Sequence, residues 1–309
     1  MNPTARIYVA GHTGLVGSAI VRCLRAEGAT NLLLRSRAEL DLTDQHETRK
    51  MFEAERPEYV FVAAAKVGGI LENTQKPASF LGENLMIATN IVDAAHRSGV
   101  KKLLFVSSSC SYPKHAPQPL KEEYLLSGPL EPTNEWHSVA KIAGVKMCQA
   151  YRRQHGLDAI VAMSTSVYGP GDNFDPTSSH LLPGLMRRFH EAKRDALPSL
   201  TLWGTGAPRR EFIHSDDLAR ACVFLMQKYS DVGMVNVGWG EDHPILDLAN
   251  IVKEVVDYDV PIVLDTSKPD GTPRKLLDVS TMNALGFRPR IGLRDGLASM
   301  YAWYLANEV

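Results

Sequence analysis

Three glycines near the start of the chain have the spacing of a phosphate-binding loop. Gly11, Gly14 and Gly17 form a G-x-x-G-x-x-G pattern between a predicted strand at Arg6–Ala10 and a predicted helix at Leu15–Glu27. Backbone N–H groups at a helix N-terminus, unobstructed by side chains, can hold a diphosphate. A plain glycine-rich turn is the alternative, but the position after the first strand favours dinucleotide binding. The residues predicted to hold the dinucleotide here are Gly11, His12, Thr13, Gly14, Leu15, Val16 and Gly17.

The loop after the second predicted strand indicates which dinucleotide is bound. Residues 34–37 contain no Asp or Glu where an acid would accept from an NAD ribose hydroxyl. Two guanidinium groups suited to a 2′-phosphate stand there instead, so we expect NADP(H) as the cofactor. The alternative is that both are solvated surface charges. The residues predicted to bind this end are Arg35, Ser36 and Arg37, with Asp41 and Leu42 placed for the adenine amino group.

The elements that position these residues alternate between short apolar runs and longer stretches of helical periodicity. This alternation is typical of consecutive β-α-β units, so we predict an α/β fold with a Rossmann-type doubly wound parallel sheet. The predicted strands are Arg6–Ala10, Asn31–Arg35, Tyr59–Ala65, Lys102–Ser107 and Ala159–Met163. The predicted helices are Leu15–Glu27, Thr43–Glu55, Ala78–Ser98 and Glu135–Gln154.

The second half of the chain differs from the first in composition and in the length of its predicted elements. After residue 171 it is richer in Pro, Gly and Arg, and the predicted strands at Leu200–Trp203, Val235–Val237 and Ile262–Leu264 are short. We expect residues 1–170 to form an NADP-binding Rossmann domain that receives later returns to its sheet. Residues 171–309 are expected to form mainly a smaller, interleaved C-terminal α/β substrate lobe.

The composition indicates a folded protein that binds small ligands at local sites. The 309 residues are 44% hydrophobic, and 34 Lys plus Arg nearly balance 35 Asp plus Glu, giving a net charge of -1. This balance argues against nucleic-acid or membrane-surface partners. No apolar run reaches the ~20 residues of a membrane span and no signal peptide is recognisable, so we expect a cytoplasmic protein. The four cysteines and the histidines lack ligand or pairing spacing, so no metal site or disulfide is expected.

Motifs along nearly the whole chain resemble those of the extended short-chain dehydrogenase/reductases and, more closely, the GDP-L-fucose synthases. The motifs lie at residues 10–17, 63–70, 108–113, 130–135, 140–144, 171–174, 187–192 and 268–275. The resemblance implies an NADPH-dependent 3,5-epimerase/4-reductase that converts GDP-4-keto-6-deoxy-D-mannose to GDP-L-fucose. It also implies a homodimer formed through the helices at Ala78–Ser98 and Glu135–Gln154.

The resemblance assigns catalytic roles to four positions. The carbonyl of a 4-keto sugar acidifies the hydrogens on C3 and C5, so acid/base groups on opposite faces can invert both centres through an enolate. Family positions map this pair onto Cys110 and His180, while Ser108 would donate to the C4 oxygen and Lys141 would bind the nicotinamide ribose. Taken singly, these residues could be a buried thiol, a helix-start residue, a strand-end cap and an exposed helix lysine.

Position 137 departs from the family pattern. The superfamily's proton donor is the Tyr of Y-x-x-x-K, and here His137 stands four residues before Lys141, on the same helix face. A phenol of pKa ~10 can be tuned down by lysine, whereas an imidazole of pKa ~6.5 is driven lower and donates poorly when neutral. We therefore expect reduction to suffer more than epimerisation. An engineered change, a natural variant and a paralogue with weak reduction all stay open.

The resemblance also implies further ligand contacts. The remaining cofactor positions are Ala63, Ala64, Ala65, Lys141, Ser164, Thr165, Ser166, Val167 and His180. The implied substrate positions are Arg188, Trp203, Arg210, Asp270 and Lys275. Departures occur at Ser164 and Ser166, where the family usually has Pro and Asn, and at Thr13, where some relatives have Arg.

Two alternatives to the main function stay open. One is a relative that performs a single step on another GDP-4-keto-6-deoxy sugar, a hexose or a heptose. The other, motivated by His137 and Ser166, is a pseudoenzyme that binds NADP(H) and a nucleotide sugar without turning them over.

Overall fold

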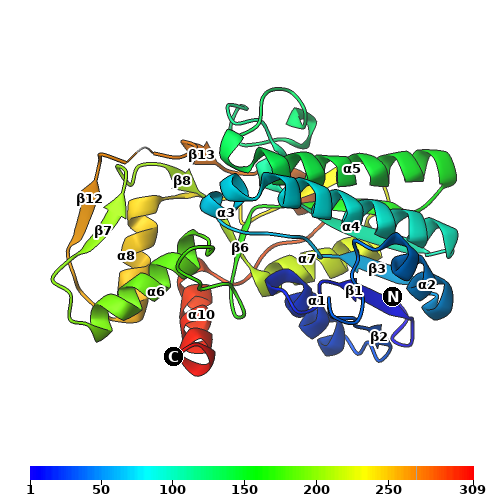
Figure 1. The fold of residues 1–309 in the computed structure, drawn as a ribbon, viewed down its shortest axis with the longest axis horizontal. Coiled ribbons are helices and arrows are strands. Elements are labelled where there is room, and N and C mark those ends of the chain that lie inside the picture. The colour runs from blue at the N-terminus through cyan, green and yellow to red at the C-terminus, as the bar shows by residue number, and fades with distance from the viewer. Residues whose placement is uncertain (269) are drawn as a thin grey trace.

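Six strands form the central sheet, and every neighbouring pair in it is parallel. A computed structural model describes residues 1–268 and 270–309; Pro269, in the 268–275 motif, lies outside the described residues. The strand order is β10-β5-β4-β3-β1-β2. The bounds are β1 Ile7–Ala10, β2 Leu32–Leu33, β3 Tyr59–Val62, β4 Lys102–Ser108, β5 Ala159–Ser164 and β10 Met234–Val237. The predicted α/β fold with a Rossmann-type parallel sheet is confirmed (Figure 1).

Helices cover both faces of this sheet. Side chains alternate between the two faces along each strand, so β1 sends Ile7 and Val9 into one core and Tyr8 and Ala10 into the other. On the Ile7 side lie α1 (Leu15–Ala26) and α7 (Ser215–Lys228). On the Tyr8 side lie α2 (Gln45–Glu55), α4 (Pro77–Arg97) and α5 (Glu135–His155). Because strand order reverses at β1, the carboxyl ends of β1 and β3 border a crevice where such sheets bind ligands.

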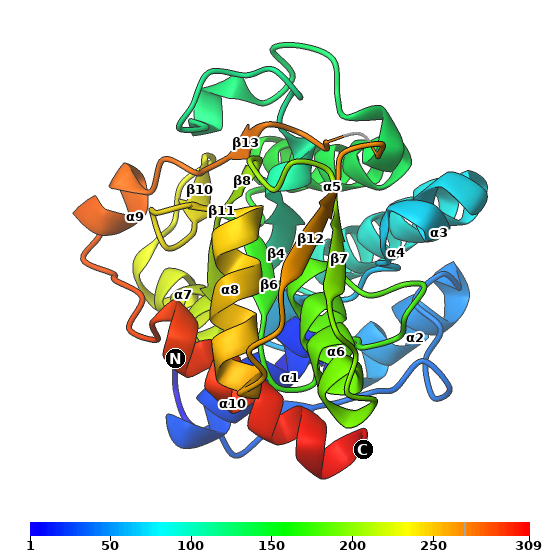
Figure 2. The ribbon, with the colours of Figure 1, turned by 90° about the vertical axis from the view of Figure 1, so that its left-hand side faces the viewer.

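The later part of the chain builds a smaller group of elements with its own apolar core. Figure 2 shows its helices around the paired strands β7 and β12. The helices are α6 Leu181–Arg194, α8 Ile245–Val256 and α10 Leu293–Asn307. The strands are β6 Ser166–Tyr168, β7 Leu200–Trp203, β8 Arg209–Arg210, β9 Phe212–His214, β11 His243–Pro244, β12 Ile262–Asp265 and β13 Arg274–Lys275.

Short elements connect the larger ones. They are α3 Ile70–Gln75, η1 Ser109–Ser111, η2 Glu122–Tyr124, η3 Pro132–Asn134 and α9 Ser280–Ala284. The second strand is shorter than the predicted Asn31–Arg35, because it pairs with β1 only at Leu32 and Leu33. The second helix begins at Gln45 rather than Thr43, because the Asp44 side chain caps it by accepting from Glu47 N. No helix among the described residues is both long and apolar enough to cross a membrane.

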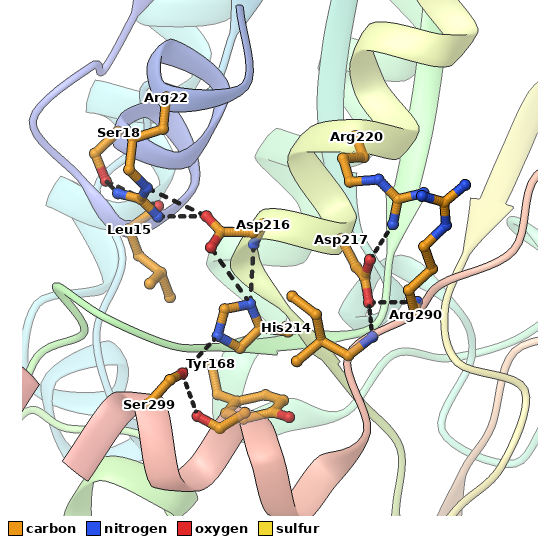
Figure 3. Close-up of polar contacts among 12 residues, drawn as sticks. Leu15, Ser18, Arg22, Tyr168, His214, Asp216, Asp217, Arg220, Arg290 and Ser299 are labelled. Carbon is orange, nitrogen blue, oxygen red and sulfur yellow. Dashed lines mark hydrogen bonds and ion pairs between the residues drawn. The ribbon is translucent and has the colours of Figure 1, made fainter. Parts of the chain in front are cut away.

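Polar contacts join the C-terminal segment to the helices on the sheet (Figure 3). The carboxylate of Asp217, at the start of α7, accepts from the backbone N–H groups of Arg290 (2.8 Å) and Ile291 (2.7 Å). His214 Nε2 lies 3.2 Å from Ser299 Oγ on α10. The segment before α10 is therefore fixed to α7, and α10 itself contacts β9, so these contacts join the smaller group of elements to a helix on the sheet.

Candidate active site

The glycine-rich loop closes tightly between β1 and α1. Gly11 has a φ of +80°, and a Cβ there would lie 2.7 Å from Ala64 Cα. A Cβ on Gly17 would lie 2.0 Å from the Gly11 carbonyl oxygen, which also accepts from Gly14 N at 3.1 Å. His12 Nδ1 is buried and has no hydrogen-bond partner among the described residues. The loop therefore excludes side chains, and its backbone N–H groups lie at a helix N-terminus open to a diphosphate.

The loop after β2 carries hydrogen-bond donors that each meet a carboxylate. The pairs are Arg35 with Glu55 (2.7 Å), Ser36 with Glu39 (2.7 Å) and Arg37 with Glu83 (3.3 Å). The Arg37 side chain is 70% exposed against 35% for Arg35, so Arg37 has more freedom to turn toward a ligand.

The residues predicted to contact the adenine, Asp41 and Leu42, already form hydrogen bonds within the protein. The Leu42 side chain lies in the core, and its carbonyl oxygen accepts from Asn90 Nδ2 at 2.9 Å. Asp41 Oδ1 accepts from the backbone N–H (2.9 Å) and hydroxyl (2.8 Å) of Thr43. Asp41 Oδ2 lies 4.0 Å from Arg37 Nη2, so an adenine would share this oxygen with Arg37 or use backbone N–H groups.

Two of the predicted positions, Ser164 at the end of β5 and Thr165 directly after it, already form hydrogen bonds within the protein. Ser164 Oγ donates to Ser107 O at 3.0 Å, across the β4–β5 pair. Thr165 Oγ1 donates to Glu211 O at 3.2 Å. Both side chains are buried, whereas Ser166 is half-buried in β6. The side chains of Ser164 and Thr165 therefore stabilise the ends of the strands they contact.

The Cys110 thiol lies just beyond the carboxyl end of β4. Cys110 lies in η1, directly after the strand, and its backbone N–H donates to Ser108 Oγ at 3.3 Å. Lys275 Nζ, on β13, lies 3.4 Å from Cys110 Sγ. Burial alone would raise the pKa of the thiol, but the Lys275 charge, Ser108 and the Arg210 charge together lower it. Cys110 is therefore disposed to ionise and act as a base.

Helix α5 presents the predicted Lys141 to this strand end. Lys141 Nζ donates to Val106 O at 2.9 Å and lies 4.9 Å from the centre of the Phe105 ring. Burial lowers the pKa of Lys141 to about 8. Ser138, on the same helix, donates to Cys110 O at 2.9 Å and so fixes the helix against η1. The Lys141 ammonium is thus held near the carboxyl end of β4, and it has N–H donors left for a ligand hydroxyl.

One turn earlier on α5, His137 faces the same cluster of cations. Its Nε2 atom is buried and has no hydrogen-bond partner among the described residues. Burial, and then the charges of Lys141, His180 and Lys275, lower the pKa of His137 to about 3. The imidazole is therefore neutral at physiological pH, with an unsatisfied nitrogen inside the site.

His180 reaches the cluster from the other side, at the residue before α6. The loop that carries it is pinned by Asp175, whose Oδ1 accepts from Thr177 N and Ser178 N at 2.9 Å each. Gly69 N, after β3, donates to Ser178 O at 3.0 Å, so the two sides of the site touch here. The protein atoms around the ring and the Lys275 charge lower the pKa of His180, which favours the neutral imidazole.

The predicted substrate residues lie on several elements of the later part of the chain. Lys275 and Arg210 lie beside Cys110, and Arg210 Nη1 is held by Thr272 O at 2.6 Å. The Trp203 ring is 70% exposed, with Lys268 Nζ 5.7 Å from its centre.

The other two substrate positions are already hydrogen-bonded. Arg188 Nη2 donates to Thr201 O. Asp270 accepts from Thr205 N at 2.9 Å and from the Thr205 hydroxyl at 2.7 Å, so it joins two segments that are 65 residues apart in the sequence.

Known proteins resemble this chain over its full length. The model of the NAD dependent epimerase/dehydratase family matches residues 7–238. A putative GDP-L-fucose synthase of Arabidopsis thaliana is 58% identical over 100% of this chain and 94% of its own length. The GDP-L-fucose synthase of Escherichia coli K12 is 49% identical over 98% and 97%. The chain belongs to the GDP-L-fucose synthases.

A solved relative of this family extends the likeness to three dimensions. The GDP-mannoheptose C4 reductase of Campylobacter jejuni, solved with NADP bound, superposes with a TM-score of 0.90 at 39% identity and covers 99% of both chains. The likeness to the family therefore includes the fold of both the sheet and the smaller group of elements.

Two residues that shape the site of this GDP-L-fucose synthase family member, Glu131 and Ser138, were not identified from the sequence. Glu131 forms an ion pair with Lys114 (3.0 Å) and accepts from Thr272 Oγ1 (3.1 Å), beside the hollow next to Cys110. Glu131 lies in a recognised motif, yet nothing local indicates its partner 141 residues later. Ser138 likewise stands between His137 and Lys141 without a sequence signal for its bond to Cys110.

Proposed function

We propose that this enzyme uses NADPH to convert GDP-4-keto-6-deoxy-D-mannose to GDP-L-fucose by epimerisation at C3 and C5 and reduction at C4. The observation that carries the proposal is the meeting of Cys110 with Lys275 at 3.4 Å in a chain 58% identical to a GDP-L-fucose synthase. A thiol that ionises readily beside fixed cations suits removal of an acidic sugar hydrogen.

The epimerisation needs one group to take a proton and another to return one on the opposite face. Cys110 and His180 approach the site from η1 and from the start of α6, and the charge of Lys275 acts on both. The enolate formed when the C3 or C5 proton leaves is stabilised by donors to the C4 oxygen. We assign this donation to Ser108, at the end of β4.

The residues present fit NADP(H), which when bound supplies the hydride that reduces C4. The glycine-rich loop would hold the diphosphate, because Gly11 and Gly17 leave a cradle that a Cβ would fill. Lys141 would bind ribose hydroxyls, and Arg37, with Arg35, would bind the 2′-phosphate. The substrate diphosphate would meet Arg210 and Lys275, with Arg188 and Trp203 farther along.

One observation favours a second candidate, an epimerase with slow or absent reduction. The alkoxide that forms at C4 needs a proton, and His137 stands where the superfamily has its donor. Its imidazole has a pKa lowered to about 3 and a buried, unpaired Nε2, so it is a poor acid at pH 7. The pair Cys110 and His180 does not depend on it.

The assembly and location are further parts of the proposal. Exposed apolar side chains on α4 and α5, Met86, Trp136 and Val139, favour a homodimer through these helices. A cytoplasmic location and a division near residue 170 into a Rossmann domain and a substrate lobe rest on the sequence.

One experiment separates the candidate functions. Purified protein is incubated with NADPH and GDP-4-keto-6-deoxy-D-mannose in D2O, and NADPH absorbance and deuterium at C3 and C5 are followed together. Both signals support the bifunctional enzyme, whereas deuterium uptake without NADPH oxidation leaves the epimerase. Tight NADPH binding with neither signal would indicate the pseudoenzyme and overturn the proposal.

A further inference from the structure

A carboxylate on α4 joins two cations at the adenosine end of the proposed cofactor site. Glu83 Oε2 lies 3.3 Å from Arg37 Nη2, and Glu83 Oε1 lies 2.9 Å from Lys66 Nζ. The Glu83 side chain is 20% exposed, while Arg37 is 70% exposed. Glu83 is therefore the more buried partner. Asp41 Oδ2 lies 4.0 Å from the same Arg37 nitrogen, so Glu83 is the nearer of the two carboxylates that hold this guanidinium.

The place of Glu83 is fixed by the helix and by the loop after β3. The neighbouring Asn84 is buried, and its side chain accepts from Lys66 N at 2.7 Å and donates to Lys66 O at 3.0 Å. Lys66 is thus held at both its backbone and its ammonium group. The hydrogen bond from Lys66 and the Lys66 and Arg37 charges lower the pKa of Glu83, so the carboxylate is ionised at neutral pH.

No other group on the 2′-phosphate loop is free to replace Arg37 without breaking a contact within the described residues. Arg35 is paired with Glu55 at 2.7 Å and also donates to Leu34 O at 3.1 Å. Ser36 N and Oγ both donate to Glu39 Oε2 at 2.7 Å. Position 13, on the adjacent glycine-rich loop, is a threonine rather than a cation.

A 2′-phosphate and the Glu83 carboxylate require the same guanidinium. An anion that binds Arg37 must share it with Glu83 or displace Glu83, and it is repelled by the Glu83 charge in either case. A cofactor with a 2′-hydroxyl meets neither obstacle. We propose that Glu83 is a specificity-determining residue that lowers the preference for NADPH over NADH by competing with the 2′-phosphate for Arg37. This inference rests on the proposed use of NADP(H).

Direct binding measurements test the proposal without any need for turnover. Dissociation constants of NADPH and NADH are measured by calorimetry for the full-length wild type and the Glu83→Gln variant. Removing an exposed or partly exposed ion pair shifts binding by up to ~1 kcal/mol, so Glu83→Gln should bind NADPH roughly threefold to fivefold more tightly. The constant for NADH should change by less than about twofold.

Two comparisons identify where the effect arises. Glu254, on α8 and far from β2, is paired with Arg294 of α10. The Glu254→Gln variant removes this other carboxylate and should leave the dissociation constants of NADPH and NADH unchanged. In an Arg37→Ala background, Glu83→Gln should lose more than half of its effect on a logarithmic scale, because the shared guanidinium is gone. Raising the salt concentration should shrink the effect in the single variant.

The outcomes are distinct. Unchanged or weaker NADPH binding by Glu83→Gln, with an unaltered melting temperature, would show that Glu83 does not compete with the phosphate. Equal tightening for NADPH and NADH would place its effect away from the 2′ position, and a full effect in the Arg37→Ala background would rule out competition for Arg37. If the wild type bound neither nucleotide, the proposed function itself would fail, and this inference with it.

Discussion

Replacing His137 by tyrosine should restore fast reduction. With a pKa of about 3, the His137 imidazole carries its extra proton in only ~10⁻⁴ of molecules at pH 7. A phenol is almost fully protonated at this pH and so has a proton to give, and the neighbouring positive charges favour phenolate and oppose the rise in phenol pKa that burial causes. Since positioned acids contribute about 10² to 10⁴-fold, His137→Tyr should accelerate reduction by roughly 10²-fold.

The His137 ring can be exchanged without breaking a hydrogen bond through Nε2 to any described residue. Nε2 of His137 has no partner to lose, and the ring faces the site between Lys141, His180 and Lys275. A phenolic oxygen extends farther from the helix backbone than Nε2 does, as the proposed role of position 137 as proton donor to the C4 oxygen requires.

The assay is NADPH oxidation in a single turnover, with deuterium exchange at C3 and C5 measured on the same samples. Exchange should stay within about threefold, because Cys110 and His180 are untouched. His137→Phe is the matched control: it keeps a ring of similar burial but has no proton, and should reduce no faster than the wild type. If His137→Tyr reduced at the wild-type rate while exchange continued, position 137 would not be the proton donor.

Three other substitutions test separate parts of the site. Lys275→Met removes the charge that lowers the pKa of Cys110, so the pH profile of thiol alkylation by iodoacetamide should move to higher pH; an unmoved profile would refute the pairing seen at 3.4 Å. Gly17→Ala places a methyl group 2.0 Å from Gly11 O, so NADPH binding should weaken at least ~10-fold in calorimetry, and normal binding would show that the loop is not close-packed. Asp172 is buried, with one carboxylate oxygen unpaired and a pKa raised to about 7. Because the folded pKa exceeds the unfolded one, stability present below pH ~4 is lost as pH rises to about 7. Asp172→Asn should therefore gain stability over wild type across this window, by ~2 kcal/mol or more in urea titrations at pH 8, and a constant difference from pH 4 to 8 would contradict this.

Local patterns were enough to predict the sheet and the glycine-rich loop. Strand, turn and helix follow each other within residues 6–27, so composition and spacing at Gly11, Gly14 and Gly17 determine the loop with little help from the rest of the fold. The end of β2 was less predictable, because hydrogen bonding to β1 stops after Leu33 although the apolar run continues to Leu34.

Contacts between distant segments could not be predicted in this way. Lys275 and Cys110 are 165 residues apart in the sequence, and no local sequence pattern around either residue predicts their contact. The family resemblance placed both in the site, yet it assigned Lys275 to the substrate and gave it no effect on the thiol. That effect depends on β13 pairing with β8 next to the end of β4, which is a property of the tertiary fold.

The same reasoning explains why His137 is more perturbed than its sequence neighbourhood suggests. The i, i+4 spacing predicts one adjacent ammonium, Lys141, on the same helix face. The fold adds Lys275 from β13 and His180 from the loop before α6, and it buries the ring. Since burial is the largest of these effects, a histidine at this position would stay neutral even if Lys141 were removed. Substituting Lys141 should therefore not rescue proton donation by His137, whereas substituting His137 itself should.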